Sequence, residues 1–177
     1  MEANVDFIIQ FSGLKDGVHT FDFQLSESFF ENFDNEEFNA VNAKAVVNLH
    51  KKPTLMEADF SLEGYVNVYC DLTNEPFDLA VSNSFQMVVK FGPAYSDDHE
   101  DMIVLPHGSH QFNVTQQLYE LLVLSVPQKR VHPGVEDGTM NSDVLEKLDQ
   151  LKPSANNHSS HREIDPRWDA LKKLKKK

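Results

Sequence analysis

Much of the N-terminal half of the chain alternates hydrophobic and polar residues, which is typical of β-strands with one buried face. Residues 7–11 and 21–25 carry Phe, Ile or Leu at every second position, and glycines lie between the two segments. This arrangement predicts two strands joined as a β-hairpin. Residues 26–33 contain three phenylalanines and predict a short helix or turn that directs those rings inward.

A second set of alternating segments is longer. Residues 41–49 are apolar at every odd position, and residues 58–70 are apolar at every even position except at Gly64. A strand as long as the second one usually bends, so Gly64 is the expected position of a bulge or kink. After a turn, two more strands are expected at 77–81 and 85–91.

The following elements are less regular. Residues 96–101 predict an acidic loop, and Thr115 is expected to cap a helix whose apolar side contains Tyr119 and Leu122. Residues 128–140 contain one proline and two glycines and predict a loop.

A short helix is expected next, capped within the Asn-Ser-Asp sequence at 141–143. Its apolar stripe consists of Val144, Leu145, Leu148 and Leu151. Residues 153–161 are rich in Ser, Asn and His and predict a linker.

Long strands with one polar face belong to antiparallel sheets. The pattern therefore predicts an α+β protein with an antiparallel, strongly bent sheet, one main helix near 115–125 and a short C-terminal helix on a linker. Whether the sheet closes into a barrel is left open. We expect an acidic β-rich core at 1–127, a loop, short helix and linker at 128–164, and a basic C-terminal helix at 165–177.

Charge is distributed unevenly along the 177 residues. Residues 1–151 contain 8 Lys and Arg against 25 Asp and Glu, a balance of −17, whereas residues 152–177 contain 8 against 3, a balance of +5. An acidic body repels a phosphate backbone and a basic tail attracts one. If the chain meets nucleic acid, the tail is therefore the part that binds it. The alternative is a solvated tail that only keeps the chain soluble.

Composition excludes several classes of protein. Cys70 is the single cysteine, so neither an intramolecular disulfide nor a zinc site of several thiolates is available. The first residues lack the pattern of a secretory signal, and the apolar runs are too short to span a bilayer. We therefore expect a cytoplasmic protein that does not bind membranes.

Candidate catalytic and metal sites are few. His107 and His110 have a short ligand spacing and His99 lies near several carboxylates, but the glycine between the pair argues against one helix face that presents both. Cys70 is followed by Asp71, whose charge works against activation of the thiol. We expect no enzyme activity, no catalytic residues, no metal and no cofactor. A metal-dependent enzyme that uses the histidines is kept as an alternative.

The last segment has the residues of a docking helix. Asp165 suits the N-cap and Pro166 suits the first helical position. Trp168, Leu171 and Leu174 recur at three-residue spacing and form a narrow apolar stripe among basic residues. A helix this short is marginal alone in water, so we expect it to dock on the body, a partner protein or RNA. The candidate binding residues are Asp165, Pro166, Arg167, Trp168, Leu171, Lys172, Lys173, Lys175 and Lys176.

The Asp-Pro-Arg-Trp sequence at 165–168, with the leucines that follow it, resembles the closing motif of the DUF177 family. Bacterial members of this family are called YceD, the large ribosomal RNA subunit accumulation proteins. Residues 64–70 resemble the family's central strand running into a cysteine. Residues 101–105 and 118–133 resemble its late strand and its leucine-rich helix ending in proline. The likeness covers residues 40–177.

The resemblance implies a bacterial, non-enzymatic factor that supports 23S rRNA accumulation or processing and large ribosomal subunit biogenesis, by binding rRNA or a ribosomal protein. The alternative is an adaptor that binds a basic ribosomal protein without direct RNA contact. Many family members carry Cys-x-x-Cys where this chain has Cys70 and Thr73, so only the first cysteine is retained. No metal or redox role of such a pair is expected here, and Cys70 is expected to serve packing.

Overall fold

The computed structural model describes residues 7–30, 33, 37–99, 101–140 and 142–152. The chain divides into two compact units, Met1–Met140 and Asn141–Lys177. Along the first unit the elements are β1 (Ile8–Gln10), β2 (Gly17–Ser26), α1 (Glu27–Phe30), β3 (Ala40–Lys51), β4 (Leu55–Tyr69), β5 (Pro76–Gly92), β6 (Ser96–His99), β7 (Met102–Pro106), β8 (Gln111–Asn113), α2 (Thr115–Ser125) and α3 (Pro133–Glu136). The described part of the second unit contains α4 (Asp143–Leu151).

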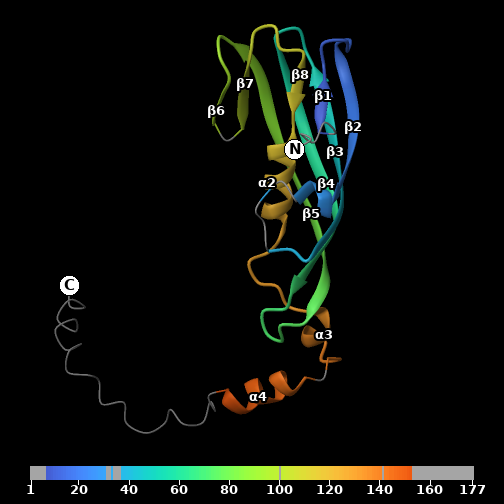
Figure 1. Cartoon of the computed structure of the whole chain (residues 1–177), viewed down its shortest axis with the longest axis vertical. Helices are drawn as coiled ribbons and strands as arrows, with labels where there is room; N and C mark the ends of the chain where they lie inside the picture. The colour runs from blue at the N-terminus through green and yellow to red at the C-terminus, as the bar shows by residue number, and fades with distance from the viewer. Residues whose placement is uncertain (1–6, 31–32, 34–36, 100, 141, 153–177) are drawn as a thin grey trace, which may run out of the picture. The chain divides into compact units, whose positions relative to one another are not determined.

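Six strands form one sheet in the order β2-β3-β4-β5-β7-β6, and every neighbouring pair is antiparallel except β5 and β7. The four long strands β2 to β5 lie side by side (Figure 1). Within the part of the chain that the structure describes, β2 and β6 are edges with one neighbour each, so the sheet is open. The predicted α+β class and mainly antiparallel bent sheet are confirmed, and the sheet does not close into a barrel.

In strands β3 and β4 the burial of side chains agrees with the alternating sequence: the apolar positions face the core and the polar positions face solvent. The register places Phe60 between Val47 on β3 and Phe85 on β5. The Phe60 and Phe85 rings stack with their centroids 4.6 Å apart. The buried residues of these two strands are Val41, Ala43, Ala45, Val47, Leu49, Met56, Ala58, Phe60, Leu62, Val66 and Val68.

Gly64 is a position of close backbone approach and not of a bulge. The pairing of β3 with β4 runs through Gly64 without a shift in register, so the bulge expected there is absent from this ladder. A Cβ atom on Gly64 would lie 2.4 Å from the Ala43 Cα and 2.5 Å from the Asn42 carbonyl oxygen. Glycine is therefore required because two strands approach too closely for a side chain.

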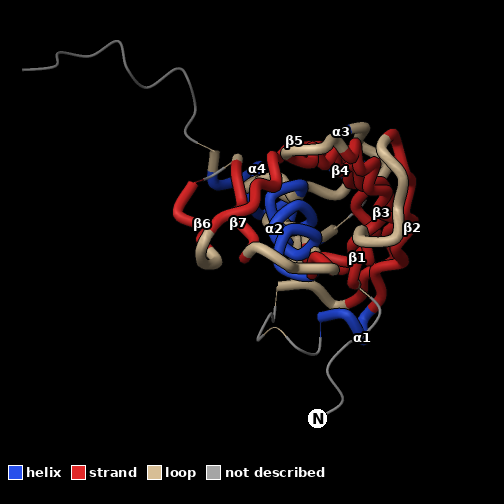
Figure 2. The backbone as a smooth tube through the Cα atoms, turned by 90° about the horizontal axis from the view of Figure 1, so that it is seen from above, coloured by secondary structure: helices blue, strands red, loops and turns tan. Residues whose placement is uncertain are grey.

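Helix α2 covers the inner face of the sheet. Viewed nearly along its axis, it lies in the middle of the first unit with the strands curving around it (Figure 2). Asn83 lies on the inner face of β5, and its Nδ2 donates a hydrogen bond to the Leu121 carbonyl oxygen at 3.5 Å. The helix buries the side chains of Gln117, Leu118, Leu121 and Leu122. The main helix predicted near 115–125 is confirmed.

The predicted N-cap of α2 is wrong by one residue. Val114 occupies the cap position and makes no side-chain cap bond, whereas Thr115 is the first helical residue. Instead, the Asn113 side chain accepts a hydrogen bond from the Thr115 N–H at 2.8 Å. A neighbouring amide therefore satisfies one of the exposed N–H groups of the first turn, which is the role predicted for Thr115.

Strand β1 does not pair with β2, so the predicted hairpin is wrong. It pairs with β8 in a separate two-stranded sheet, with Ile9 opposite Phe112. The reason is burial: Ile9 has 0% exposed surface, and the Phe7 ring stacks on Phe23 of β2 with centroids 5.7 Å apart. The strand lies over the inner face with Ile9 buried and Gln10 exposed, instead of extending the sheet at its edge.

The phenylalanines of residues 26–33 face inward, as predicted. Phe29 and Phe30 are buried and Phe33 is half-buried against the core. The Phe33 ring stacks on Tyr119 of α2 with centroids 4.0 Å apart and an interplanar angle of 10°. Aromatic contacts of this kind join the α1 region to α2.

Three further elements differ from the predictions. The two strands expected before residue 92 are one strand, β5, because β4 supplies a hydrogen-bonding neighbour from Pro76 to Lys90 without a break. The acidic segment at 96–101 includes β6, which pairs antiparallel with β7. The expected loop at 128–140 contains α3, whose cap residue His132 accepts a hydrogen bond at Nδ1 from the Gly134 N–H at 2.9 Å.

Helix α4 of the second unit begins as predicted. Its N-cap is Ser142, whose Oγ accepts a hydrogen bond from the Val144 N–H at 3.3 Å. The apolar stripe is exposed at Val144, Leu148 and Leu151, and the helix has no buried residue in the part of the chain that the structure describes.

Candidate functional site

The candidate binding residues of the C-terminal segment lie outside the described residues, and so does Leu174 of the same apolar stripe. The structure therefore gives no placement for Asp165, Pro166, Arg167, Trp168, Leu171, Lys172, Lys173, Lys175 and Lys176. The described part of the chain contains two other places where polar groups converge: the outer face of the sheet and the C-terminal end of β4.

The outer face of the sheet, opposite α2, is polar and solvated. Amide, hydroxyl and carboxylate side chains bond across neighbouring strands on this face. Thr20 Oγ1 donates to Asn48 Oδ1 at 2.7 Å, and Asn67 Nδ2 donates to Asp78 Oδ1 at 2.7 Å. These pairs come from the polar halves of the alternating patterns, so the sequence predicts the composition of this face.

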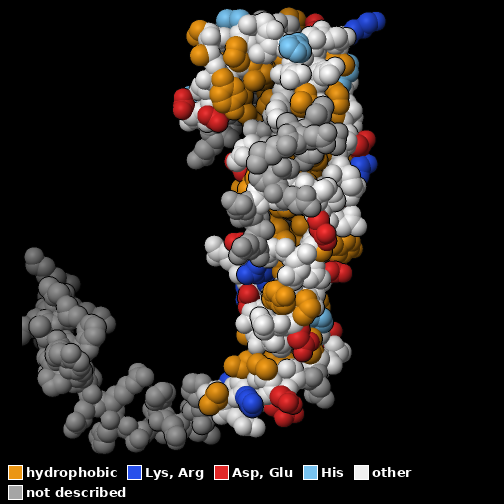
Figure 3. Space-filling view, viewed as in Figure 1, with side chains coloured by type: hydrophobic (Ala, Val, Ile, Leu, Met, Phe, Trp, Pro, Cys, Tyr) orange, Lys and Arg blue, Asp and Glu red, His pale blue; other side chains and the backbone are white. Residues whose placement is uncertain are grey.

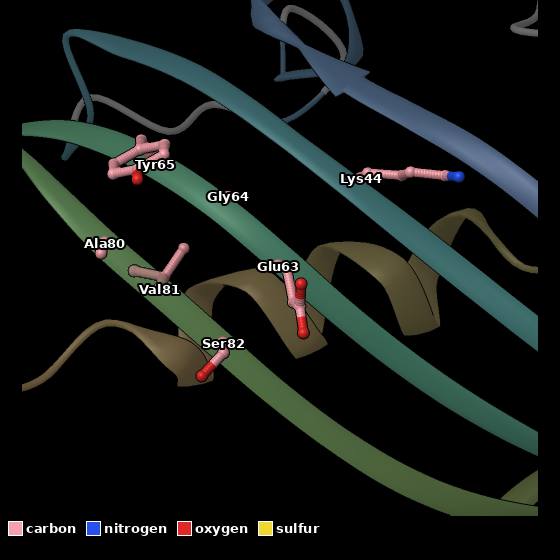
Figure 4. A pocket seen from close by; sticks show the side chains of 7 residues that line it. All are labelled: Lys44, Glu63, Gly64, Tyr65, Ala80, Val81 and Ser82. Carbon is pink, nitrogen blue, oxygen red and sulfur yellow. The ribbon is translucent and has the colours of Figure 1, made fainter.

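A hollow of about 450 Å³ lies in this face where β3, β4 and β5 run side by side (Figure 4). Its floor is the backbone at Gly64, an inward-facing position of β4, together with the small side chains of Ala80 and Ser82 on β5. Glu63 and Tyr65 flank the glycine. The lining residues are Lys44, Glu63, Gly64, Tyr65, Ala80, Val81 and Ser82.

The two charged residues that line the hollow, Lys44 and Glu63, do not form an ion pair with each other. Lys44 lies opposite Glu63 in the register, yet its Nζ pairs with Asp22 Oδ1 at 2.7 Å. The Lys44 side chain points away from Glu63 (Figure 4). No described residue forms an ion pair or hydrogen bond with the Glu63 carboxylate. The Tyr65 side chain next to it is 58% exposed. The hollow thus presents an unpaired negative charge beside an open aromatic ring.

The end of β4 is tied to the segment that precedes α3. The Asp71 N–H donates to the Arg130 carbonyl oxygen at 2.8 Å, and the Arg130 N–H donates to Asp71 Oδ2 at 2.6 Å. Arg130 Nε also lies 3.7 Å from Asp71 Oδ1. One hydrogen bond between main-chain groups, one from a main-chain N–H to a carboxylate, and one ion pair therefore hold Arg130 against the end of the sheet.

Cys70 is part of the same connection. Its side chain is 2% exposed, and its Sγ accepts a hydrogen bond from the His132 N–H at 3.4 Å. Burial raises the pKa of this thiol, but hydrogen bonds to sulfur from the Thr73 side chain and from main-chain N–H groups outweigh it, so the pKa is lowered. The Thr73 side chain therefore supports the Cys70 sulfur.

Sequence reasoning missed the roles of Asp71 and Arg130. They are separated by 59 positions, and neither has a pattern that indicates the other. His132 was noted only as part of the family resemblance, whereas its ring packs edge-on against Phe77 with centroids 5.3 Å apart.

The histidines considered as metal ligands belong to different turns and strands. His99 lies on β6, His107 follows β7 and His110 precedes β8. The His107 N–H donates to the Gly92 carbonyl oxygen at 2.9 Å, which continues the pairing of β7 with β5. Among the residues with described positions, no three His, Cys, Asp or Glu side chains come together in a way that could hold a metal ion.

Acidic side chains are spread over the face seen in Figure 3 and do not gather in one patch. None of the described helices is both long enough and apolar enough to cross a membrane. At the outer hollow one acidic side chain, Glu63, lies beside the exposed ring of Tyr65.

Comparison with known proteins gives one match. The sequence model of the family described as large ribosomal RNA subunit accumulation protein YceD matches residues 58–175. The comparisons with curated proteins and with solved structures gave no match. The matched segment begins in β4, includes Cys70 and His132, and extends through the Asp-Pro-Arg-Trp sequence into the terminal lysines. The chain belongs to the YceD family of large ribosomal RNA subunit accumulation proteins.

Proposed function

We propose that this chain is a non-enzymatic factor of bacterial large-subunit biogenesis that supports accumulation and processing of 23S rRNA in the cytoplasm. Its membership of the YceD family supports the pathway, because the family is described by large-subunit rRNA accumulation. It acts by binding: the basic C-terminal segment contacts rRNA, and the acidic body faces protein partners.

The separation of charge is the observation that carries this division of work. The body to residue 151 has a balance of −17, and residues 152–177 have +5. A polyanion is repelled by the first and attracted by the second. The family match extends to residue 175, so the basic segment is part of what relates this chain to the family.

A salt series with a 23S rRNA fragment tests this proposal. The full chain and a truncation ending at Pro153 are titrated with the fragment, and the logarithm of affinity is plotted against that of salt concentration. For single-stranded RNA each lost phosphate contact lowers the magnitude of the slope by roughly 0.7. We expect the truncation to bind more weakly and with a shallower slope. Equal affinities and equal slopes would exclude the tail as the RNA-binding element.

Two matched variants of the full chain separate position from total charge. One replaces four tail lysines with Gln, and the other replaces four body lysines. The tail set is Lys172, Lys173, Lys175 and Lys176. The body set is Lys44, Lys52, Lys90 and Lys129. The proposal expects a large loss of RNA affinity in the tail variant and a small one in the body variant.

The second candidate is an adaptor that binds a basic ribosomal protein without direct RNA contact. The acidic body favours this mode because such a partner is cationic. Pull-downs with and without nuclease distinguish the two. Recovery of one ribosomal protein that persists after nuclease favours the adaptor, and recovery that is lost with the RNA favours the rRNA-binding factor.

A further inference from the structure

We propose that the hollow on the outer face of the sheet is the docking point for a lysine or arginine side chain of a basic protein. Glu63 supplies the counter-charge and Tyr65 supplies an aromatic wall. The inference rests on the proposed function for the class of partner, a basic ribosomal protein, and it adds the site at which that partner is held.

The argument begins with the Glu63 carboxylate. In a sheet with this register Lys44 is its direct cross-strand neighbour, and a pair between them would neutralise the hollow. Lys44 pairs with Asp22 instead, so among the described residues the Glu63 carboxylate keeps an unpaired charge. An incoming phosphate would be repelled by this carboxylate, whereas an ammonium or guanidinium group would be attracted.

The second step concerns Tyr65. Its ring is 58% exposed and stands two positions from Glu63 on the same side of β4. A cation over an aromatic face gains about 0.5–1 kcal/mol at an exposed site, and more when water is excluded. A neutral side chain of the same shape gains neither this contribution nor the attraction of the carboxylate. Glu63 and Tyr65 together therefore favour a cationic side chain over a neutral one.

The third step concerns shape. Gly64 and Ala80 leave the floor of the hollow close to the backbone, so the aliphatic stem of a Lys or Arg can lie along it. Tyr69 is 50% exposed on the same face of β4, about 13 Å further along at 3.3 Å per residue. A partner segment lying along β4 therefore meets a second exposed ring after the first.

The probe is a fluorescent Arg-Gly repeat peptide, and its control is the same peptide with citrulline in place of arginine. Citrulline preserves the shape of the side chain and removes its charge. Binding to the full chain is measured by anisotropy, and the site is located by amide chemical shifts of isotope-labelled protein. We expect binding of the arginine peptide only, with the largest shifts between residues 63 and 66 and between 80 and 82.

Variants assign the roles. Glu63→Gln is expected to weaken binding by about threefold to fivefold, which is the range of an exposed ion pair. Tyr65→Leu is expected to weaken it by about twofold to fivefold, whereas Tyr65→Phe retains the ring and most of the affinity. Lys44→Gln removes the competing cation and is expected to tighten binding. Glu57→Gln, on the same face of β4 but outside the hollow, is the control for total charge and is expected to change little.

Three results would overturn the assignment: equal binding of the citrulline peptide, equal effects of Glu63→Gln and Glu57→Gln, or shifts confined to other parts of the chain. A gain of tenfold or more on truncation at Pro153 would identify the chain's own basic segment as the occupant, which also overturns it. If the peptide does not bind at the hollow but rRNA binding still depends on the tail, the docking assignment is wrong and the proposed function is unaffected. Loss of tail-dependent rRNA binding with an intact hollow overturns the proposed RNA contact alone.

Discussion

Gly64 lies opposite Ala43 in the β3–β4 ladder, so close that a Cβ atom on the glycine would lie 2.4 Å from the Ala43 Cα. The two strands approach most closely beneath the outer hollow, whose lining includes Gly64. A single methyl group at this position must push the strands apart, and this gives the first prediction.

Gly64→Ala is expected to lower the free energy of unfolding by about 1–3 kcal/mol or more, the range for overpacking. Urea unfolding followed by circular dichroism measures it. Gly13→Ala is the matched control, because a Cβ there has nothing within 4 Å. The control is expected to change stability by less than about 0.5 kcal/mol. Equal stability of the two variants would contradict the close approach.

The second prediction concerns the link between Asp71 and Arg130. Asp71→Ala removes the acceptor of the Arg130 N–H and is expected to cost about 1–3 kcal/mol. Asp71→Asn retains one carbonyl acceptor and is expected to cost less. Hydrogen exchange of the Arg130 amide reports the link directly. Unchanged protection of this amide in Asp71→Ala would show that the side chain does not hold the segment.

The third prediction is a pH dependence. Burial raises the pKa of the Cys70 thiol. Hydrogen bonds from Thr73 and from main-chain N–H groups together lower it by more, so the pKa lies below its ordinary value of 9.0. A folded pKa below the unfolded one stabilises the folded state at high pH, and this contribution is lost as the pH falls through the folded pKa. The stability difference between the natural chain and Cys70→Ala is therefore expected to grow as the pH rises from about 7 towards 10. A difference that shrinks over this range contradicts the lowered pKa.

The fourth prediction tests how α2 is held against the sheet. Leu122 is completely buried, whereas Leu124 on the same helix is 77% exposed. Leu122→Ala is expected to lower the free energy of unfolding by about 2–5 kcal/mol, and Leu124→Ala by less than about 0.5 kcal/mol. Thermal or urea unfolding compares the two. Similar costs would mean that α2 does not form one layer of the core.

The alternation of side chains predicts which face of β3 and β4 is buried, because the period of a strand is fixed by its geometry. It does not predict which strand pairs with which. Residues 8–10 pair with 111–113, and no local pattern links segments so far apart. The alternation predicts two strands where β5 is one, because the middle of β5 contains Asn83, a polar residue that faces inward and bonds to α2.

The candidate site likewise has one part that the sequence predicts and one part that it does not. The polar side of β4, with Glu63 and Tyr65, follows from the alternation. The hollow and its unpaired carboxylate do not, because they depend on how β3, β4 and β5 pair and on the ion pair that Lys44 forms with Asp22. The tail was found from local capping and spacing alone, and it lies outside the described residues, so its binding role stays a prediction.

The ratio of 23S to 16S rRNA in cells depleted of this protein tests the central claim most directly. The account predicts that the ratio falls on depletion and is restored by the full chain, but not by the truncation ending at Pro153. A ratio that is unchanged by depletion, or that the truncation restores fully, would contradict it.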